Sequence, residues 1–88
     1  MYRVIVSKRA VGHASLLKSA HLDKKAKELL KILENNPFQN PPPYEKLVGD
    51  MAGLYSRRIN HQHRLVYQVD ADTSTVRILS MWTHYETL

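Results

Sequence analysis

The chain of 88 residues has no cysteine, one tryptophan, one phenylalanine and three glycines. The lack of cysteine excludes a disulfide and any thiolate chemistry. No apolar run approaches the roughly 20 residues that a membrane-spanning helix needs. The apolar start, Tyr2 to Val6, is too short for a signal peptide and favours a β-strand. We therefore expect a cytoplasmic protein that makes no contact with a membrane.

Positive charge is what the chain has in excess. It carries 13 Lys and Arg against 8 Asp and Glu, a net charge of +5 and a pI of about 9.7. A length of 88 residues predicts a single domain, residues 1–88, with a small core. The positive charge predicts an anionic partner, which could be a nucleic acid, an anionic surface or an acidic protein.

The N-terminal half predicts a strand followed by two helices. Ser7 is a suitable N-cap for a helix over residues 8–19. Asp23 is expected to cap a second helix over residues 24–35, on which apolar residues form one stripe and lysines fill most of the other face. We expect those lysines to be a solvated surface rather than an RNA-binding face. The prolines 41–43 then predict an extended polyproline connector that fixes the position of the residues after it.

The C-terminal half predicts three strands, over residues 54–60, 63–70 and 75–83. Leu65, Tyr67 and Val69 alternate with Arg64, Val66 and Gln68, a pattern that fits a half-buried antiparallel sheet. The expected fold is α+β, in the order β-α-α-β-β-β. Two N-terminal helices would pack on one face of a mainly antiparallel four-stranded sheet. The other face would be open and would carry Arg64.

A base, an acid and cations are the groups that cleave an RNA phosphodiester without a metal. Glu45, which follows the proline run, is the best candidate for the base that takes the 2′-hydroxyl proton. On sequence alone an exposed loop carboxylate is the commoner explanation. His84 is the best candidate for the acid, because histidine can donate a proton near neutral pH. The alternative is a histidine at a frayed chain end.

Three arginines lie in and beside the predicted central hairpin and suggest an anion site. Arg58 and Arg64 are the candidates for holding a phosphate, and their alternative is a row of surface charges. Arg57 would point to the opposite face from Arg58 if the strand is regular. His61 and His63 are spaced to share a metal ion, but no third ligand is evident. We therefore expect no metal and no other cofactor.

Several motifs together resemble the YoeB/Txe toxins, of the RelE superfamily of bacterial toxin–antitoxin modules. The resemblance covers roughly residues 37–85. It rests on the block S-R-R-I followed by H-R-L-V-Y, with H-Y near the end of the chain. The matching runs are Pro43-Tyr44-Glu45-Lys46-Leu47, Gly53-Leu54-Tyr55-Ser56-Arg57-Arg58-Ile59, His63-Arg64-Leu65-Val66-Tyr67 and His84-Tyr85.

The resemblance implies a microbial-RNase-like fold and a ribosome-dependent mRNA endonuclease held inactive by an antitoxin. It places the general base at Glu45, the general acid at His84 and the phosphate-binding arginines at Arg58 and Arg64. The aromatic residue of the site falls on Tyr85. The products would include a 2′,3′-cyclic phosphate. The implied partners are a cognate antitoxin of the YefM or Phd kind, the ribosome and mRNA, and either a homodimer or a toxin–antitoxin hetero-oligomer is compatible with this.

Two of the departures from the family pattern concern the site. Many relatives have a lysine three residues after the glutamate, where this chain has Val48. Lys46 could supply that charge, and we assign Lys46 and His63, with Tyr85, to RNA binding. Residues 86–88 also extend beyond the tyrosine at which many relatives stop. The alternatives are a non-catalytic RNA- or ribosome-binding module, and a basic groove that docks an acidic protein. Cleavage with a cyclic phosphate end would distinguish the nuclease from both.

Overall fold

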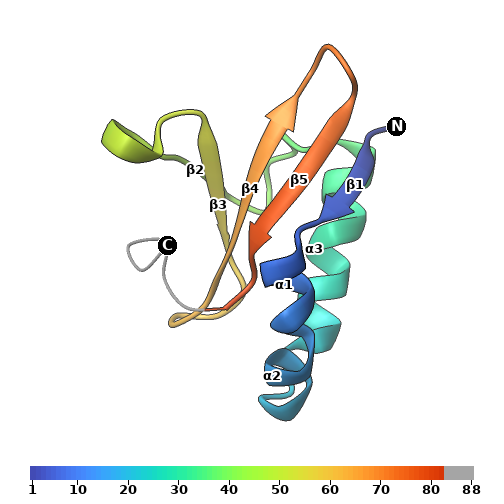
Figure 1. Cartoon of the computed structure of the whole chain (residues 1–88), viewed down its shortest axis with the longest axis vertical. Helices are drawn as coiled ribbons and strands as arrows, with labels where there is room; N and C mark the ends of the chain where they lie inside the picture. The colour runs from blue at the N-terminus through green and yellow to red at the C-terminus, as the bar shows by residue number, and fades with distance from the viewer. Residues whose placement is uncertain (83–88) are drawn as a thin grey trace.

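The computed structural model describes residues 1–82 and consists of a twisted sheet with helices along one face (Figure 1). A strand opens the chain, helices and a long connection follow, and the remaining strands come last. In chain order the elements are β1 (Arg3–Val6), α1 (Lys8–Gly12), α2 (Ala14–Ser19), α3 (Asp23–Asn35), β2 (Glu45–Lys46), the 3₁₀ turn η1 (Gly49–Met51), β3 (Leu54–Arg58), β4 (Arg64–Asp70) and β5 (Thr75–Ser80).

The strands form one five-stranded sheet in the order β1-β5-β4-β3-β2. β1 runs parallel to β5, whereas the other neighbouring strands are antiparallel. The predicted α+β architecture is confirmed, but the prediction of four strands is wrong because β2 adds a fifth. β2 consists of Glu45 and Lys46, which pair with Ser56 and Tyr55 of β3. Two residues are too few to produce a periodic pattern in the sequence.

The first predicted helix, over residues 8–19, is two short helices that meet at His13. The backbone N–H of Met81 donates to His13 Nδ1 at 3.2 Å, which ties this junction to the end of β5. Ser7 caps α1 as predicted, because its hydroxyl accepts a hydrogen bond from the Ala10 backbone N–H.

The second predicted helix is α3, and its amphipathic character is confirmed. Ala26, Leu29 and Leu33 are buried on the side of the helix that faces the sheet. The predicted side-chain cap is wrong, since Asp23 is itself the first helical residue and Leu22 is the N-cap. A carboxylate in the first turn still favours the helix through its dipole. Among the described residues, none of the helices combines the length and the apolar character needed to cross a bilayer.

The core lies between the helices and the facing side of the sheet. Leu65 and Tyr67 of β4 are fully buried there, together with Ile78 of β5 and Leu33 of α3. The alternation predicted for β4 is thus confirmed on the helix side. Val66 points to the other side and is also fully buried, so the face that was predicted to be open is covered at this position.

The connection from α3 to β2 is not the extended polyproline segment that was predicted. The chain bends at residues 41 and 42. The peptide bonds Asn40–Pro41 and Pro41–Pro42 are cis. The connection nevertheless leads directly into β2, so its shape determines where that short strand begins.

Candidate active site

The pairing of three strands brings four polar side chains to one face of the sheet. Glu45 of β2 lies opposite Ser56 of β3, and Arg58 of β3 lies opposite Arg64 of β4. Ser56 and Arg58 are two residues apart on the same strand and therefore share a face. Arg57, between them, pairs with Leu65 of the core. The four polar side chains consequently lie on the face that points away from the helices.

Arg64 connects this group. Its Nη2 donates to Glu45 Oε1 at 3.4 Å, and its Nη1 donates to Ser56 Oγ at 3.3 Å. The side chain of Arg64 is only 13% exposed, whereas that of Glu45 is 55% exposed. The arginine is thus held in place by its surroundings, while the carboxylate stays accessible to a ligand.

These residues line a hollow of about 230 Å³. Its walls are Pro43, Tyr44, Glu45, Ser56, Arg58 and Arg64. Two permanently charged guanidinium groups and one carboxylate give the hollow an excess of positive charge. A guanidinium fork matches the oxygens of a phosphate. The volume is below the roughly 300–1,000 Å³ of drug-sized ligand pockets, which suits a phosphate and the atoms beside it.

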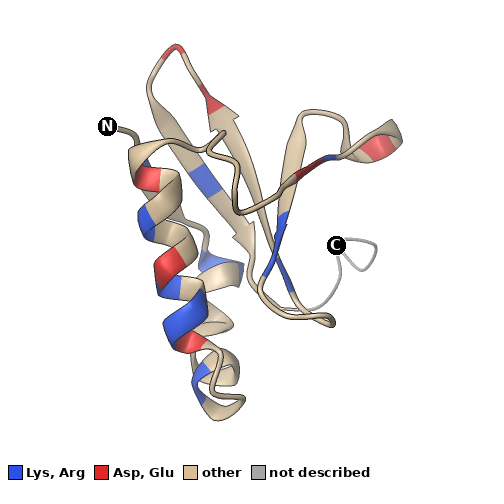
Figure 2. Ribbon diagram, turned by 180° about the vertical axis from the view of Figure 1, so that it is seen from behind, with Lys and Arg blue, Asp and Glu red and all other residues tan. Residues whose placement is uncertain are grey.

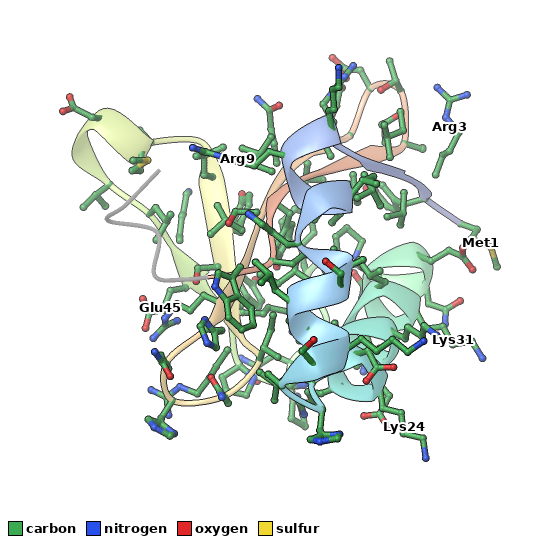
Figure 3. All side chains as sticks on the ribbon, turned by 60° about the horizontal axis from the view of Figure 1, so that its bottom comes forward. Met1, Arg3, Arg9, Lys24, Lys31 and Glu45 are labelled. Atoms are coloured by element: carbon green, nitrogen blue, oxygen red, sulfur yellow. The ribbon has the colours of Figure 1, made fainter. Side chains whose placement is uncertain are left out.

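The basic positions of this site are separate from those of the helices. Figure 2 shows positive residues where β3 and β4 run side by side, and a second, mixed set of positive and negative residues along α3. Lys24 and Lys31 of α3 lie on the opposite side of the molecule from Glu45 (Figure 3). The α3 lysines are exposed to solvent and do not contribute to the hollow.

Arg57 has a different role from the other two arginines. It is fully buried and donates to the carbonyl oxygens of Pro37, Gln39 and Pro42. The prediction that it faces away from Arg58 is confirmed, so of the three arginines that suggested an anion site only Arg58 and Arg64 line the hollow. Sequence reasoning missed this role. A signal was available, because an inward-pointing arginine needs acceptors and a proline run offers carbonyls without N–H groups.

Lys46 and His63 lie outside the hollow. Side chains alternate along a strand, so Lys46 points to the opposite face from Glu45. His63 is buried and stacks on Trp82, with ring centroids 3.8 Å apart and planes inclined by 18°. Burial, with a smaller contribution from His61, lowers the pKa of His63. That these two residues bind RNA remains a prediction.

His84 and Tyr85 lie outside the described residues, so their assignments as acid and RNA-binding aromatic remain predictions. Within residues 1–82 there is no group of three or more His, Asp or Glu side chains that could hold a metal ion. In the described part of the chain, the candidate site is therefore the Glu45 carboxylate paired with Arg64, which also bonds the Ser56 hydroxyl, in a hollow that Arg58 lines as well.

Comparison with known proteins identifies the family. The sequence model described as "YoeB-like toxin of bacterial type II toxin-antitoxin system" matches residues 16–85. The chain belongs to this family. The resemblance to YoeB/Txe toxins that the motifs indicated is thus confirmed. Escherichia coli K12 Toxin YoeB is 42% identical over 50 residues, which is 57% of this chain and 60% of that protein. The chain thus spans about three fifths of the length of this curated YoeB relative.

Solved structures of YoeB proteins have the same fold over nearly the whole chain. The YoeB/ParE toxin from Agrobacterium tumefaciens superposes with a TM-score of 0.83 at 27% identity, covering 94% of this chain and 99% of that one. The YoeB chain of a heterotetrameric YoeB–YefM complex from Staphylococcus aureus gives a TM-score of 0.78 at 35% identity, covering 97% and 99%. The five-stranded sheet of this YoeB-like toxin is therefore an architecture that its solved relatives share.

Proposed function

We propose that this toxin is a ribosome-dependent mRNA endonuclease that uses the 2′-hydroxyl of its substrate as the nucleophile. The observation that supports it is the contact of 3.4 Å between Glu45 Oε1 and Arg64 Nη2 in a hollow that Arg58 also lines. The contact brings the candidate base and a candidate phosphate-binding group close together, as cleavage of one phosphodiester would require. Membership in a toxin family supports an activity that harms the host cell.

The proposed reaction has one displacement at phosphorus. Glu45 removes the proton of the 2′-hydroxyl, and that oxygen forms a new bond to phosphorus. Arg58 and Arg64 hold the non-bridging oxygens while negative charge grows on them. The bond from phosphorus to the 5′-oxygen breaks, and His84 supplies the proton that this oxygen takes. The products are a 2′,3′-cyclic phosphate and a free 5′-hydroxyl, and DNA, which has no 2′-hydroxyl, is not cleaved.

The proposed partners are an antitoxin, the ribosome and mRNA. The S. aureus YoeB of known structure forms a heterotetramer with YefM. By analogy, a YefM- or Phd-like antitoxin would bind this basic chain through an acidic or amphipathic segment that folds on binding. The proposed place of action is the cytoplasm, because the proposed substrate is mRNA on translating ribosomes.

The chemistry of the RNA ends tests the proposal. The toxin is induced in growing cells, ribosome-bound mRNA is isolated, and 2′,3′-cyclic phosphate ends are mapped. We expect new ends within translated regions, absent after induction of Glu45→Ala and present after induction of Arg77→Ala, which changes an exposed arginine of β5. RNA that is bound but intact would instead identify a non-catalytic RNA- or ribosome-binding module.

A further inference from the structure

Arg57 of β3 holds the connection between α3 and β2. Its guanidinium donates to the carbonyl oxygens of Pro37 at 3.0 Å, Gln39 at 2.9 Å and Pro42 at 2.6 Å. Its Nε–H donates to the hydroxyl of Tyr67 at 3.1 Å. Three carbonyl oxygens spread over residues 37–42 are therefore bound by one side chain, that of Arg57, which is 0% exposed.

The connection and the arginine each supply what the other lacks. Proline has a carbonyl acceptor and no N–H donor, so a proline-rich segment depends on donors from elsewhere. A buried guanidinium is costly unless its N–H groups find acceptors. The connection bends at residues 41 and 42, and the carbonyl of Pro42 accepts a hydrogen bond from Arg57, which lies on the helix side of β3. Arg57 therefore makes several of the contacts that fix the shape of the connection, together with the Tyr67 hydroxyl, which donates to the Pro37 carbonyl.

Glu45 follows the connection directly, so the path of the connection sets where β2 begins. β2 has two residues and lies at the edge of the sheet, where it pairs with β3 alone. Tyr44 precedes it and lies with its ring centroid 4.9 Å from the Arg57 guanidinium carbon. The same Tyr44 lines the hollow beside Glu45. Arg57 thus acts on the entry into β2 through both the backbone and an aromatic ring.

We propose that Arg57 is a positioning residue. It holds the connection from the helix-facing side of the sheet and so places the carboxylate of Glu45 beside Arg64. This inference rests on the proposed function, in which Glu45 is the base. Arg57 does not line the hollow, so it acts on Glu45 through the connection and through Tyr44. A displacement of about 1 Å at a reacting group can slow a reaction on the order of a hundredfold.

Positioning and simple stabilisation of the fold make different kinetic predictions. A residue that only stabilises the fold changes the fraction of active molecules, and so lowers the amplitude of cleavage in a single turnover. A residue that positions the base lowers the rate constant itself, even when every mRNA–ribosome complex is bound. Binding depends on Arg58 and Arg64 in the proposed mechanism and should not follow the loss of Arg57.

The experiment uses the full-length toxin on ribosomes programmed with a defined mRNA. Arg57→Met removes the charge, and Arg57→Lys keeps it but cannot span the carbonyls of Pro37, Gln39 and Pro42 together. Arg77→Met is the matched control on an exposed arginine. For both Arg57 variants we expect a rate constant at saturating toxin that is about 10- to 100-fold lower, with a Kd for the ribosome within about twofold of the unchanged toxin.

Three results would overturn the inference. They are a wild-type rate constant in a folded Arg57 variant, a lower amplitude with an unchanged rate constant, and a rate loss that follows a weaker Kd. Where neither Arg57 variant folds, Tyr67→Phe, which removes the hydroxyl bonded to Arg57 Nε, replaces them with the same criteria. Glu45→Ala separates the two proposals. If it cleaves at the wild-type rate, the proposed function fails, whereas if it alone loses activity, only the role of Arg57 fails.

Discussion

Arg57 and Arg58 are adjacent in the chain and lie on opposite faces of β3. Arg57 is fully buried among carbonyl oxygens, whereas Arg58 is exposed and lines the hollow with Glu45. The alternation of side chains along a strand gives two identical residues two different surroundings. In the proposed mechanism, one arginine supports the base and the other binds the substrate.

Replacing Glu45 by glutamine is expected to separate activity from stability. The amide keeps the size of the side chain but cannot accept the 2′-hydroxyl proton, so cleavage should fall by about 100-fold or more, because general acid–base catalysis contributes roughly 100- to 10,000-fold. Glu45 is 55% exposed, and an ion pair this accessible is worth no more than about 1 kcal/mol. The melting temperature, measured by circular dichroism, should therefore fall by only a few degrees. Undiminished cleavage by a folded Glu45→Gln toxin would exclude this carboxylate as the base.

Replacing Arg58 by alanine is expected to weaken RNA binding in a salt-dependent way. Each phosphate contact that is lost reduces the slope of log K against log salt by about 0.7 for single-stranded RNA. Titrations of a non-cleavable RNA at several salt concentrations measure this slope, with Arg77→Ala as the control for loss of a charge elsewhere. An Arg58→Ala slope equal to that of the control would show that Arg58 does not contact a phosphate.

The parts of the fold that were predicted correctly are those with a local cause. The apolar stripe of α3 and the alternation of Leu65 and Tyr67 follow from periodic patterns within short stretches of the sequence. The break between α1 and α2 is marked by a hydrogen bond from Met81 to His13, residues 68 positions apart. β2 is a strand because its two residues pair with β3. Such long-range causes leave no periodic trace in a sequence.

The candidate site shows the same division. Alternation alone predicted that Arg57 and Arg58 face opposite ways, and this is confirmed. Residue type and the family resemblance both pointed to Glu45 and Arg64, but it is the strand register that brings Glu45 within 3.4 Å of Arg64. The three carbonyl acceptors of Arg57 lie 15 to 20 residues before it in a segment with no regular structure. Their convergence could not be predicted from spacing.

His13 is expected to make the protein less stable as the pH falls. Burial, and to a lesser degree the charge of Arg9, lower the pKa of His13 from 6.5. The unfolded chain then binds a proton at a higher pH than the folded protein, so stability is retained above about pH 6.5 and declines below it. Protonation also removes the acceptor of the Met81 N–H. Urea denaturation of the native protein and of His13→Ala between pH 7.5 and 5 should show a smaller decline in the variant, and equal declines would exclude this role.

Tyr67 is expected to destabilise the protein at alkaline pH. Burial raises its pKa from 10.0 to about 12, against a smaller opposing effect of the Arg57 charge and hydrogen bond. Above pH 10 the unfolded chain loses the phenolic proton while the folded protein keeps it. The free energy of unfolding should therefore fall by up to about 1.4 kcal/mol per pH unit between pH 10 and 12.

Replacing Tyr67 by phenylalanine distinguishes this effect from general alkaline denaturation. The variant loses the hydroxyl that bonds Arg57 Nε and the Pro37 carbonyl, so it should be less stable at pH 8. It has no phenol to ionise at this position, so its stability should decline less steeply from pH 10 to 12. Urea denaturation at pH 8, 10 and 11 measures both quantities. Parallel stability curves for the two proteins above pH 10 would mean that Tyr67 ionises alike in the folded and unfolded states, which the full burial of this side chain argues against.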